Sequence, residues 1–129
     1  MEKIIIINSK KIPPAIGPYS PAVRVGKILF TSGQLPIDPE KGEIVRGDIQ
    51  KQTTQVLENL ITLLNLYSTT LKNVVKTTVF LKDMNDFSKF NQVYAKYFKE
   101  EFPARSCVEV ACLPKNAAIE MEAIAFFTD

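Results

Sequence analysis

A short stretch near the C-terminus, residues 102–110 (FPARSCVEV), carries three reactive side chains at alternate positions. If the stretch is a strand, Arg105, Cys107 and Glu109 place a guanidinium, a thiol and a carboxylate on one face, because successive strand side chains point to opposite faces. Two residues of strand advance about 6.6 Å, roughly the length of a small carboxylic acid. The planar donors of an arginine suit bidentate binding of a carboxylate, so the row suggests a carboxylate-binding strand. On strand geometry alone, an exposed strand with one surface ion pair is the more ordinary interpretation.

The sequence contains no histidine, and this absence removes several classes of chemistry. A Ser-His-Asp triad, a Cys-His pair, a His-based ribonuclease mechanism and a His-ligated metal are all excluded within this polypeptide. General acid or base work must fall to carboxylates, lysine, tyrosine or cysteine. Cys107 and Cys112 are an odd number of residues apart and would face opposite sides of one strand, so we expect neither a disulfide nor a zinc pair between them. This cysteine usage fits a reducing compartment.

Length and composition bound the class of protein. A chain of 129 residues fits one domain, residues 1–129, that can bury a core without disulfide or metal staples. The net charge of +2 and the scattered lysines do not predict a basic surface for nucleic acid or an anionic membrane. The apolar run 4–7 is too short for a signal-peptide core, and polar residues interrupt the apolar positions of residues 56–66. We therefore expect a cytoplasmic protein with no membrane partner.

The first quarter of the chain predicts a strand, a stiff loop and a hairpin. Residues 4–7 are a β-branched run suited to a strand buried on both faces. Residues 12–21 contain too many prolines for regular structure, and Tyr19 within them is either an anchor packed on the domain or a hydroxyl offered to a ligand. Residues 22–32 predict two strands joined by a tight turn at Gly26.

Small and polar residues close this hairpin. Ser32 can donate a hydroxyl hydrogen bond, and Gly33 lets a ligand or another backbone approach closely. The plainer alternative is a strand end that leads into a loop over residues 35–42.

Two amphipathic segments predict helices. Asp48 is a candidate N-cap for the first helix, although residues 68–70 provide no glycine to end it. Its apolar face follows helical spacing: Ile49, Thr53, Val56, Leu57, Leu60, Leu63, Leu64 and Tyr67. Asp83 or Asp86 can cap the second helix, whose aromatic stripe predicts a core face: Phe87, Phe90, Tyr94, Tyr97 and Phe98. Asn91 lies on or near that stripe, and a buried amide there needs a partner, either protein or substrate.

The remaining strands complete a fold prediction. Residues 74–81 alternate as a strand, and residues 117–127 give a last strand on which Glu120 and Glu122 share a face. The order of elements predicts one α+β domain with both helices on one face of the sheet. Because residues 74–81 carry apolar side chains on both sides, we expect the other face to be partly hidden by oligomerisation.

Five stretches together resemble the Rid (YjgF) family of reactive-intermediate deaminases over nearly the whole chain. They are GPYS at 17–20, TSGQ at 31–34, VKTTVFL at 75–81, FPARSCVEV at 102–110 and IEMEA at 119–123. The resemblance implies a chorismate-mutase-like α+β fold and a homotrimer with sites in the clefts between subunits. It also implies hydrolysis of 2-imino acids such as 2-iminobutanoate and 2-iminopropanoate, and of their enamine tautomers, to 2-keto acids and ammonia. Members have also been described as ribonucleases or translation inhibitors.

Carried over residue by residue, the resemblance assigns roles to seven positions. Arg105 would bind the substrate carboxylate, Glu120 would hold and activate water, and the backbone beside Cys107 would help to position the imine. The remaining pocket residues would be Tyr19, Ser32, Gly33 and Asn91. The sequence departs from the family pattern at Cys112, where many members have arginine, and at residues 67–68, where Tyr-Ser replaces a common Ala-Gly.

The implied chemistry agrees with the residues present. An imine is already electrophilic, so hydrolysis needs no metal, cofactor or covalent nucleophile, and general base assistance typically adds about 10² to 10⁴ in rate. From the residues alone, Glu109 and Glu122 are as eligible as Glu120, and Cys107 is a small packed group rather than a nucleophile. Two alternatives stay open: a trimer that only binds small carboxylates, and a metal-independent ribonuclease, which the low charge and lack of histidine disfavour.

Overall fold

The structure is a computed structural model, and it describes residues 2–6 and 9–128. The elements in chain order are β1 (Lys3–Ile4), β2 (Ala22–Val25), β3 (Ile28–Thr31), β4 (Ile37–Asp38), β5 (Glu43–Ile44), α1 (Ile49–Leu66), β6 (Val74–Leu81), α2 (Phe87–Tyr97), β7 (Ala104–Glu109) and β8 (Ile119–Phe126). Short 3₁₀ turns precede β6, α2 and β8. Six strands form one mixed sheet in the order β1-β2-β3-β8-β6-β7, in which only the β6–β7 pair is parallel. β4 and β5 form a separate small hairpin.

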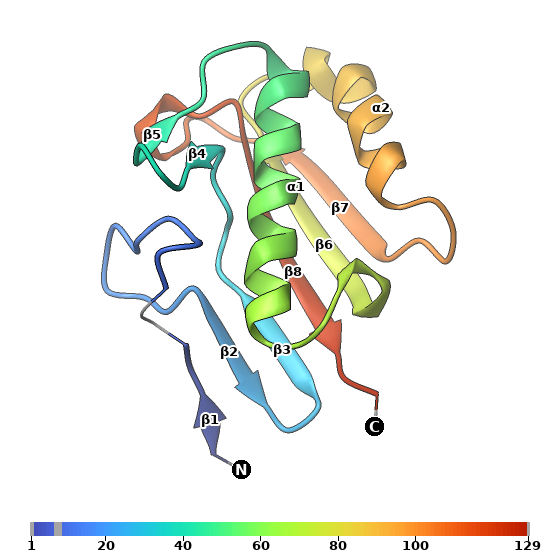
Figure 1. Cartoon of the computed structure of the whole chain (residues 1–129). Coiled ribbons are helices and arrows are strands. Elements are labelled where there is room, and N and C mark those ends of the chain that lie inside the picture. The colour runs from blue at the N-terminus through green and yellow to red at the C-terminus, as the bar shows by residue number, and fades with distance from the viewer. Residues whose placement is uncertain (1, 7–8, 129) are drawn as a thin grey trace.

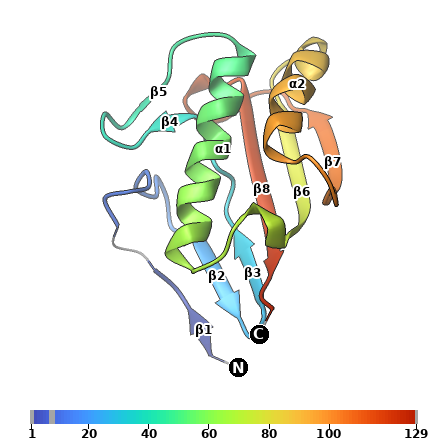
Figure 2. The same ribbon diagram turned by 45° about the vertical axis from the view of Figure 1, so that its right-hand side comes forward.

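Both helices cover the same face of the sheet (Figures 1 and 2). α1 crosses the middle of the sheet and α2 lies beside it over β6 and β7 (Figure 1). The core between helices and sheet includes Leu57, Leu60 and Leu64 of α1, Phe90 of α2 and Met121 of β8, all with almost no exposed surface. The α+β fold with two helices on one face, predicted from the sequence, is confirmed.

The first helix begins where the sequence predicts and ends in a strained turn. The Asp48 side chain accepts a hydrogen bond of 3.0 Å from the Lys51 amide, which satisfies one of the free N–H groups of the first turn. At the other end Ser68 adopts φ of +61°, a left-handed conformation that glycine usually provides. The Thr69 amide then donates to the Leu64 carbonyl at 3.0 Å and closes the helix.

The strand predictions at the N-terminal end are partly wrong. The hairpin is confirmed, with Gly26 at φ of +58° between β2 and β3. The predicted strand 4–7, buried on both faces, is instead the two-residue edge strand β1, in which Ile4 is 52% exposed; residue 7 lies outside the described residues. As the outermost strand it has a neighbour on one side only. Residues 35–42, predicted as loop, include β4 of the small hairpin.

The second face of the sheet is bare in one chain. Along β8, Ile119, Met121, Ala123 and Ala125 are buried under the helices, while Glu120, Glu122, Ile124 and Phe126 alternate onto the opposite face. Large apolar side chains stand exposed on that face, including Ile28, Phe30, Val108 and Phe126. We refer to it as the open face.

Candidate functional site

The Arg105 guanidinium lies on the helix-covered side of the sheet, above a set of aromatic rings. β7 aims the side chain at α2, where its central carbon is 4.8 Å from the ring centre of Tyr94, 5.3 Å from Phe90 and 5.5 Å from Phe87. Within the described part of the chain, the guanidinium has no ion pair and no hydrogen bond to protein. Its donors are therefore available for an anion, and a planar fork of N–H groups suits a carboxylate.

An open cleft of about 340 Å³ lies beside this guanidinium. Its lining residues are Asn91, Tyr94, Ala95, Phe102, Pro103 and Arg105. Asn91 is half-buried, and its amide makes no hydrogen bond with any other described residue. Phe102 is 68% exposed at the rim. The structure thus brings together Arg105 and Asn91, two of the predicted site residues. Both line one cleft, together with apolar side chains.

Cys107 and Glu109 share the face of Arg105, as the alternation predicted. Cys107 is half-buried against the core, and this burial raises the pKa of its thiol, although the nearby Arg105 charge acts in the opposite direction. A thiol with a raised pKa is a poor nucleophile at neutral pH, which agrees with its interpretation as a packed group. The Glu109 carboxylate accepts a hydrogen bond of 2.8 Å from the Met84 amide, just before α2. In the described residues this row therefore has no surface ion pair.

Glu120 lies on the open face and is half-buried. Burial raises the pKa of its carboxyl group above the usual range, and the charge of Glu122, two residues further along the same face, raises it again. A carboxylate with a raised pKa is a stronger base, suited to taking a proton from water.

Gly33 makes room for the Glu120 side chain. A Cβ atom placed on Gly33 would lie 2.5 Å from Oε2 of Glu120 and 2.6 Å from its Cδ. The backbone of Gly33 is in an ordinary region, so space is the reason for the glycine. The close approach predicted for Gly33 is therefore made by the Glu120 carboxylate itself.

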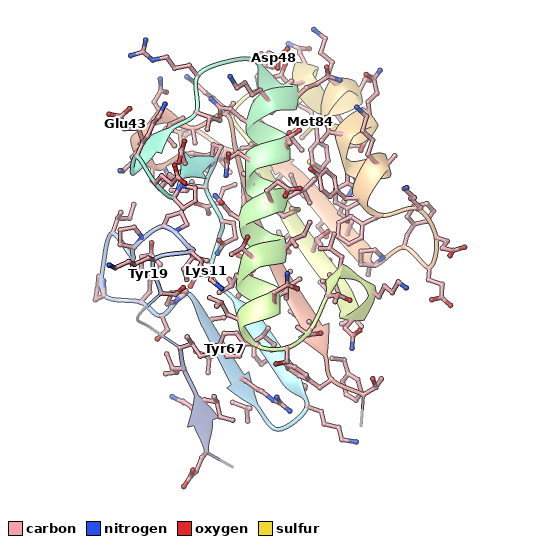
Figure 3. All side chains as sticks on the ribbon, viewed as in Figure 1. Lys11, Tyr19, Glu43, Asp48, Tyr67 and Met84 are labelled. Atoms are coloured by element: carbon pink, nitrogen blue, oxygen red, sulfur yellow. The ribbon has the colours of Figure 1, made fainter. Side chains whose placement is uncertain are left out.

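Ser32 and Tyr19 lie near Gly33. The Ser32 hydroxyl donates to the Ser20 carbonyl at 2.6 Å, which ties the proline-rich loop to the end of β3. The Ser32 hydroxyl hydrogen is therefore used within the protein, so this hydroxyl could only accept a hydrogen bond from a ligand. The Tyr19 hydroxyl accepts from the Ile16 amide at 3.2 Å, and the ring, 45% exposed, borders a hollow that Gly33 also lines. Figure 3 shows Tyr19 on the loop before β2, on the far side of α1 from α2.

The seven predicted residues thus form two groups, one around Arg105 on the helix-covered face of the sheet and one around Glu120 on the open face. The first group is Arg105, Asn91 and Cys107, and the second is Glu120, Gly33, Ser32 and Tyr19. In the sheet, β6 separates β7 from β8. Arg105 points toward the helices and Glu120 points away from them, so the two side chains of one chain do not share a pocket.

Sequence reasoning missed the rings that surround Arg105. It placed Phe87, Phe90 and Tyr94 on a core face, and Phe90 and Tyr94 are indeed buried there. Their second contact, with the guanidinium, depends on β7 packing beneath α2. The signal available in the sequence was the arginine on a strand that follows an aromatic helix.

Comparisons with known proteins agree with this arrangement of strands and helices. The family model described as Endoribonuclease L-PSP matches residues 9–127. The human 2-iminobutanoate/2-iminopropanoate deaminase is 46% identical over 120 residues, which cover 93% of this chain and 88% of that protein. A Yersinia pestis protein of unknown function from the conserved Rid family, YyfA, superposes with a TM-score of 0.93 at 49% identity, covering 98% of this chain and 100% of that one. The structure of Escherichia coli TdcF with bound serine superposes with a TM-score of 0.89 at 43% identity, covering 95% of this chain and 98% of that one.

The fold is therefore that of a six-stranded mixed sheet with two helices on one face, shared with solved Rid/YjgF structures. The chain belongs to the Rid/YjgF/L-PSP family. Among the described residues, no helix is long and apolar enough to cross a membrane.

Proposed function

We propose that this protein hydrolyses 2-imino acids, 2-iminobutanoate and 2-iminopropanoate among them, to 2-keto acids and ammonia. The observation that carries the proposal is the Arg105 guanidinium, which faces an open cleft with all its donors unused by the described residues. A relative at 46% identity is named for this reaction, and a structural relative at 43% identity binds serine, a small amino acid with a carboxylate.

The proposed chemistry assigns one task to each charged residue. Arg105 binds the substrate carboxylate and fixes the position of the C=N carbon. Glu120 takes a proton from water as the water oxygen bonds to that carbon and the C=N electron pair moves to nitrogen. The proton then passes from Glu120 to nitrogen. When this tetrahedral adduct breaks down, its new hydroxyl gives its proton through Glu120 to nitrogen and the C–N bond breaks. Ammonia and the 2-keto acid then leave.

Such a site needs two copies of the chain, because Arg105 and Glu120 lie on opposite sides of the sheet in one copy. We propose a homotrimer in which the open face of one subunit contributes Glu120, Gly33, Ser32 and Tyr19. The cleft of its neighbour contributes Arg105, Asn91 and the backbone beside Cys107. Burial of the exposed apolar side chains of the open face would drive this assembly.

The proposal is tested by generating the imine in situ with an amino acid oxidase and measuring ammonia and 2-keto acid release with and without the purified protein. We expect acceleration that Arg105→Ala abolishes. Unchanged turnover in Arg105→Ala would remove the role assigned to Arg105.

The same preparation separates the two alternatives. A protein that binds 2-ketobutanoate in calorimetry without accelerating imine hydrolysis would be a carboxylate-binding module, which Arg105 would serve equally well. RNA cleavage that persists through purification and is lost in Arg105→Ala would favour the ribonuclease. The net charge of +2 gives little support for nucleic acid as a partner.

A further inference from the structure

The guanidinium of Arg105 is held by aromatic rings rather than by hydrogen-bond acceptors. Phe87, Phe90 and Tyr94 surround it at 4.8–5.5 Å, and no described residue accepts from it. A ring face attracts a cation through its quadrupole and uses none of the N–H donors. A carboxylate partner in the protein would fix the guanidinium equally well but would occupy the donors that a ligand needs.

We propose that these three rings, here called the aromatic floor, are positioning residues that preorganise Arg105 for binding a carboxylate. The inference rests on the proposed function for the identity of the ligand. It adds that the orientation of the guanidinium, and hence carboxylate affinity, is set by α2.

The floor is itself braced from the sheet. The Tyr94 hydroxyl lies 2.8 Å from Oγ1 of Thr77, and Thr77 is fully buried. Thr77 of β6 is also the register partner of Arg105 on β7. One strand pair therefore fixes both the ring and the cation above it, and the bond to Thr77 leaves the face of the Tyr94 ring for the guanidinium.

The rings also follow one another along α2. The ring centres of Phe87 and Phe90 are 6.5 Å apart, those of Phe90 and Tyr94 are 5.4 Å apart, and those of Tyr94 and Phe98 are 4.6 Å apart. Phe98 extends the stack without a contact of its own to Arg105. Phe98 directly follows the last residue of α2, at the opposite end of the helix from Phe87, and provides a control position.

The experiment compares Phe87→Leu with Phe98→Leu. Phe87 is half-buried, so its replacement should leave the fold intact. We expect Phe87→Leu to weaken 2-ketobutanoate binding about 5- to 30-fold, from the usual strength of cation–π contacts. KM for the imine should rise by a similar factor, because binding of the carboxylate is common to ground and transition states. Phe87→Tyr should restore both values, and Phe98→Leu should change neither beyond its effect on stability.

A spectroscopic measurement tests the floor without any ligand. Ring currents should shift the Nε–H proton resonance of Arg105 upfield in the wild type, and Phe87→Leu should reduce that shift while Phe98→Leu leaves it. Equal effects of Phe87→Leu and Phe98→Leu on affinity, or an unchanged Arg105 resonance in Phe87→Leu, would overturn the inference. Binding of 2-ketobutanoate that depends on Phe87 without imine turnover would overturn only the proposed function.

Discussion

Two inactive variants of this protein should restore activity when they assemble together. Arg105→Ala removes the proposed carboxylate anchor from the helix-covered face, and Glu120→Gln removes the proposed base from the open face. Because a sheet separates these side chains in each chain, the proposed site would take one of them from each of two copies. On this proposal each variant alone would have no intact site, whereas a mixed assembly would have some.

The size of the recovery follows from counting. In an equal mixture, the subunit that supplies the Arg105 half is intact in half of the cases, and its neighbour supplies an intact Glu120 half in half of the cases. About a quarter of the sites are therefore complete if subunits mix at random around a closed ring. The expected activity is about a quarter of that of the wild type, whatever the number of subunits in the ring.

The assay mixes the two purified variants, dissociates and reassembles them, and measures imine hydrolysis before and after. A matched control mixes Glu120→Gln with Gly33→Ala, which damage the same half-site, so no combination of subunits is complete. Activity that stays at the level of the separate variants after verified subunit exchange would refute the shared site. Recovery in the control mixture would refute the assignment of Gly33 and Glu120 to one half.

Three further predictions concern the half-site on the open face and the end of α1. Glu122→Gln should lower the pKa of Glu120 toward its usual range by removing a neighbouring negative charge. Since the base must be ionised, the acid limb of kcat/KM should move to lower pH, and a limb that stays in place would exclude Glu120 as the base. Gly33→Ala should displace the Glu120 carboxylate and lower kcat about 10²-fold or more with little change in Tm, whereas Gly17→Ala, whose added Cβ meets Tyr19 at an ordinary 3.5 Å, should stay near wild type. Ser68→Gly should raise the free energy of unfolding in urea by about 0.5–1 kcal/mol, because glycine removes the cost of the left-handed turn. Ser68→Ala, which keeps that cost, should not.

Local chemistry explains which parts of the fold the sequence predicts well. The hairpin depends on Gly26 and the start of α1 depends on Asp48, and both act on backbone groups a few residues away. The aromatic stripe of α2 follows from helical spacing alone. By contrast, the exposure of β1 is set by its place at the edge of the sheet, and β4 exists only because residues 43–44 pair with it. Neither depends on a nearby residue.

The candidate site shows the same division between local and long-range information. Alternation along a strand places Arg105 with Cys107, and Glu120 with Glu122, so each row is predictable by itself. Which row faces the helices depends on the order of strands in the finished sheet, where β6 lies between β7 and β8. The family resemblance selected both residues and implied sites between subunits, but it did not say which residues one chain holds together and which it holds apart.

This separation lets the two half-sites have opposite environments. Closely packed rings hold the cation and leave its donors free, and the helix-covered face offers them. The base needs enough burial to raise its pKa and enough exposure to meet water, and a half-buried position on the open face offers both. If both groups shared one pocket in a single chain, they would attract each other. A guanidinium in contact with Glu120 would lower the pKa of that carboxyl group, and its N–H donors would be used by the Glu120 carboxylate. Within one chain the opposite faces therefore preserve the free N–H donors and the raised pKa together, and in the proposed assembly the substrate carboxylate would take those donors and leave Glu120 as the base.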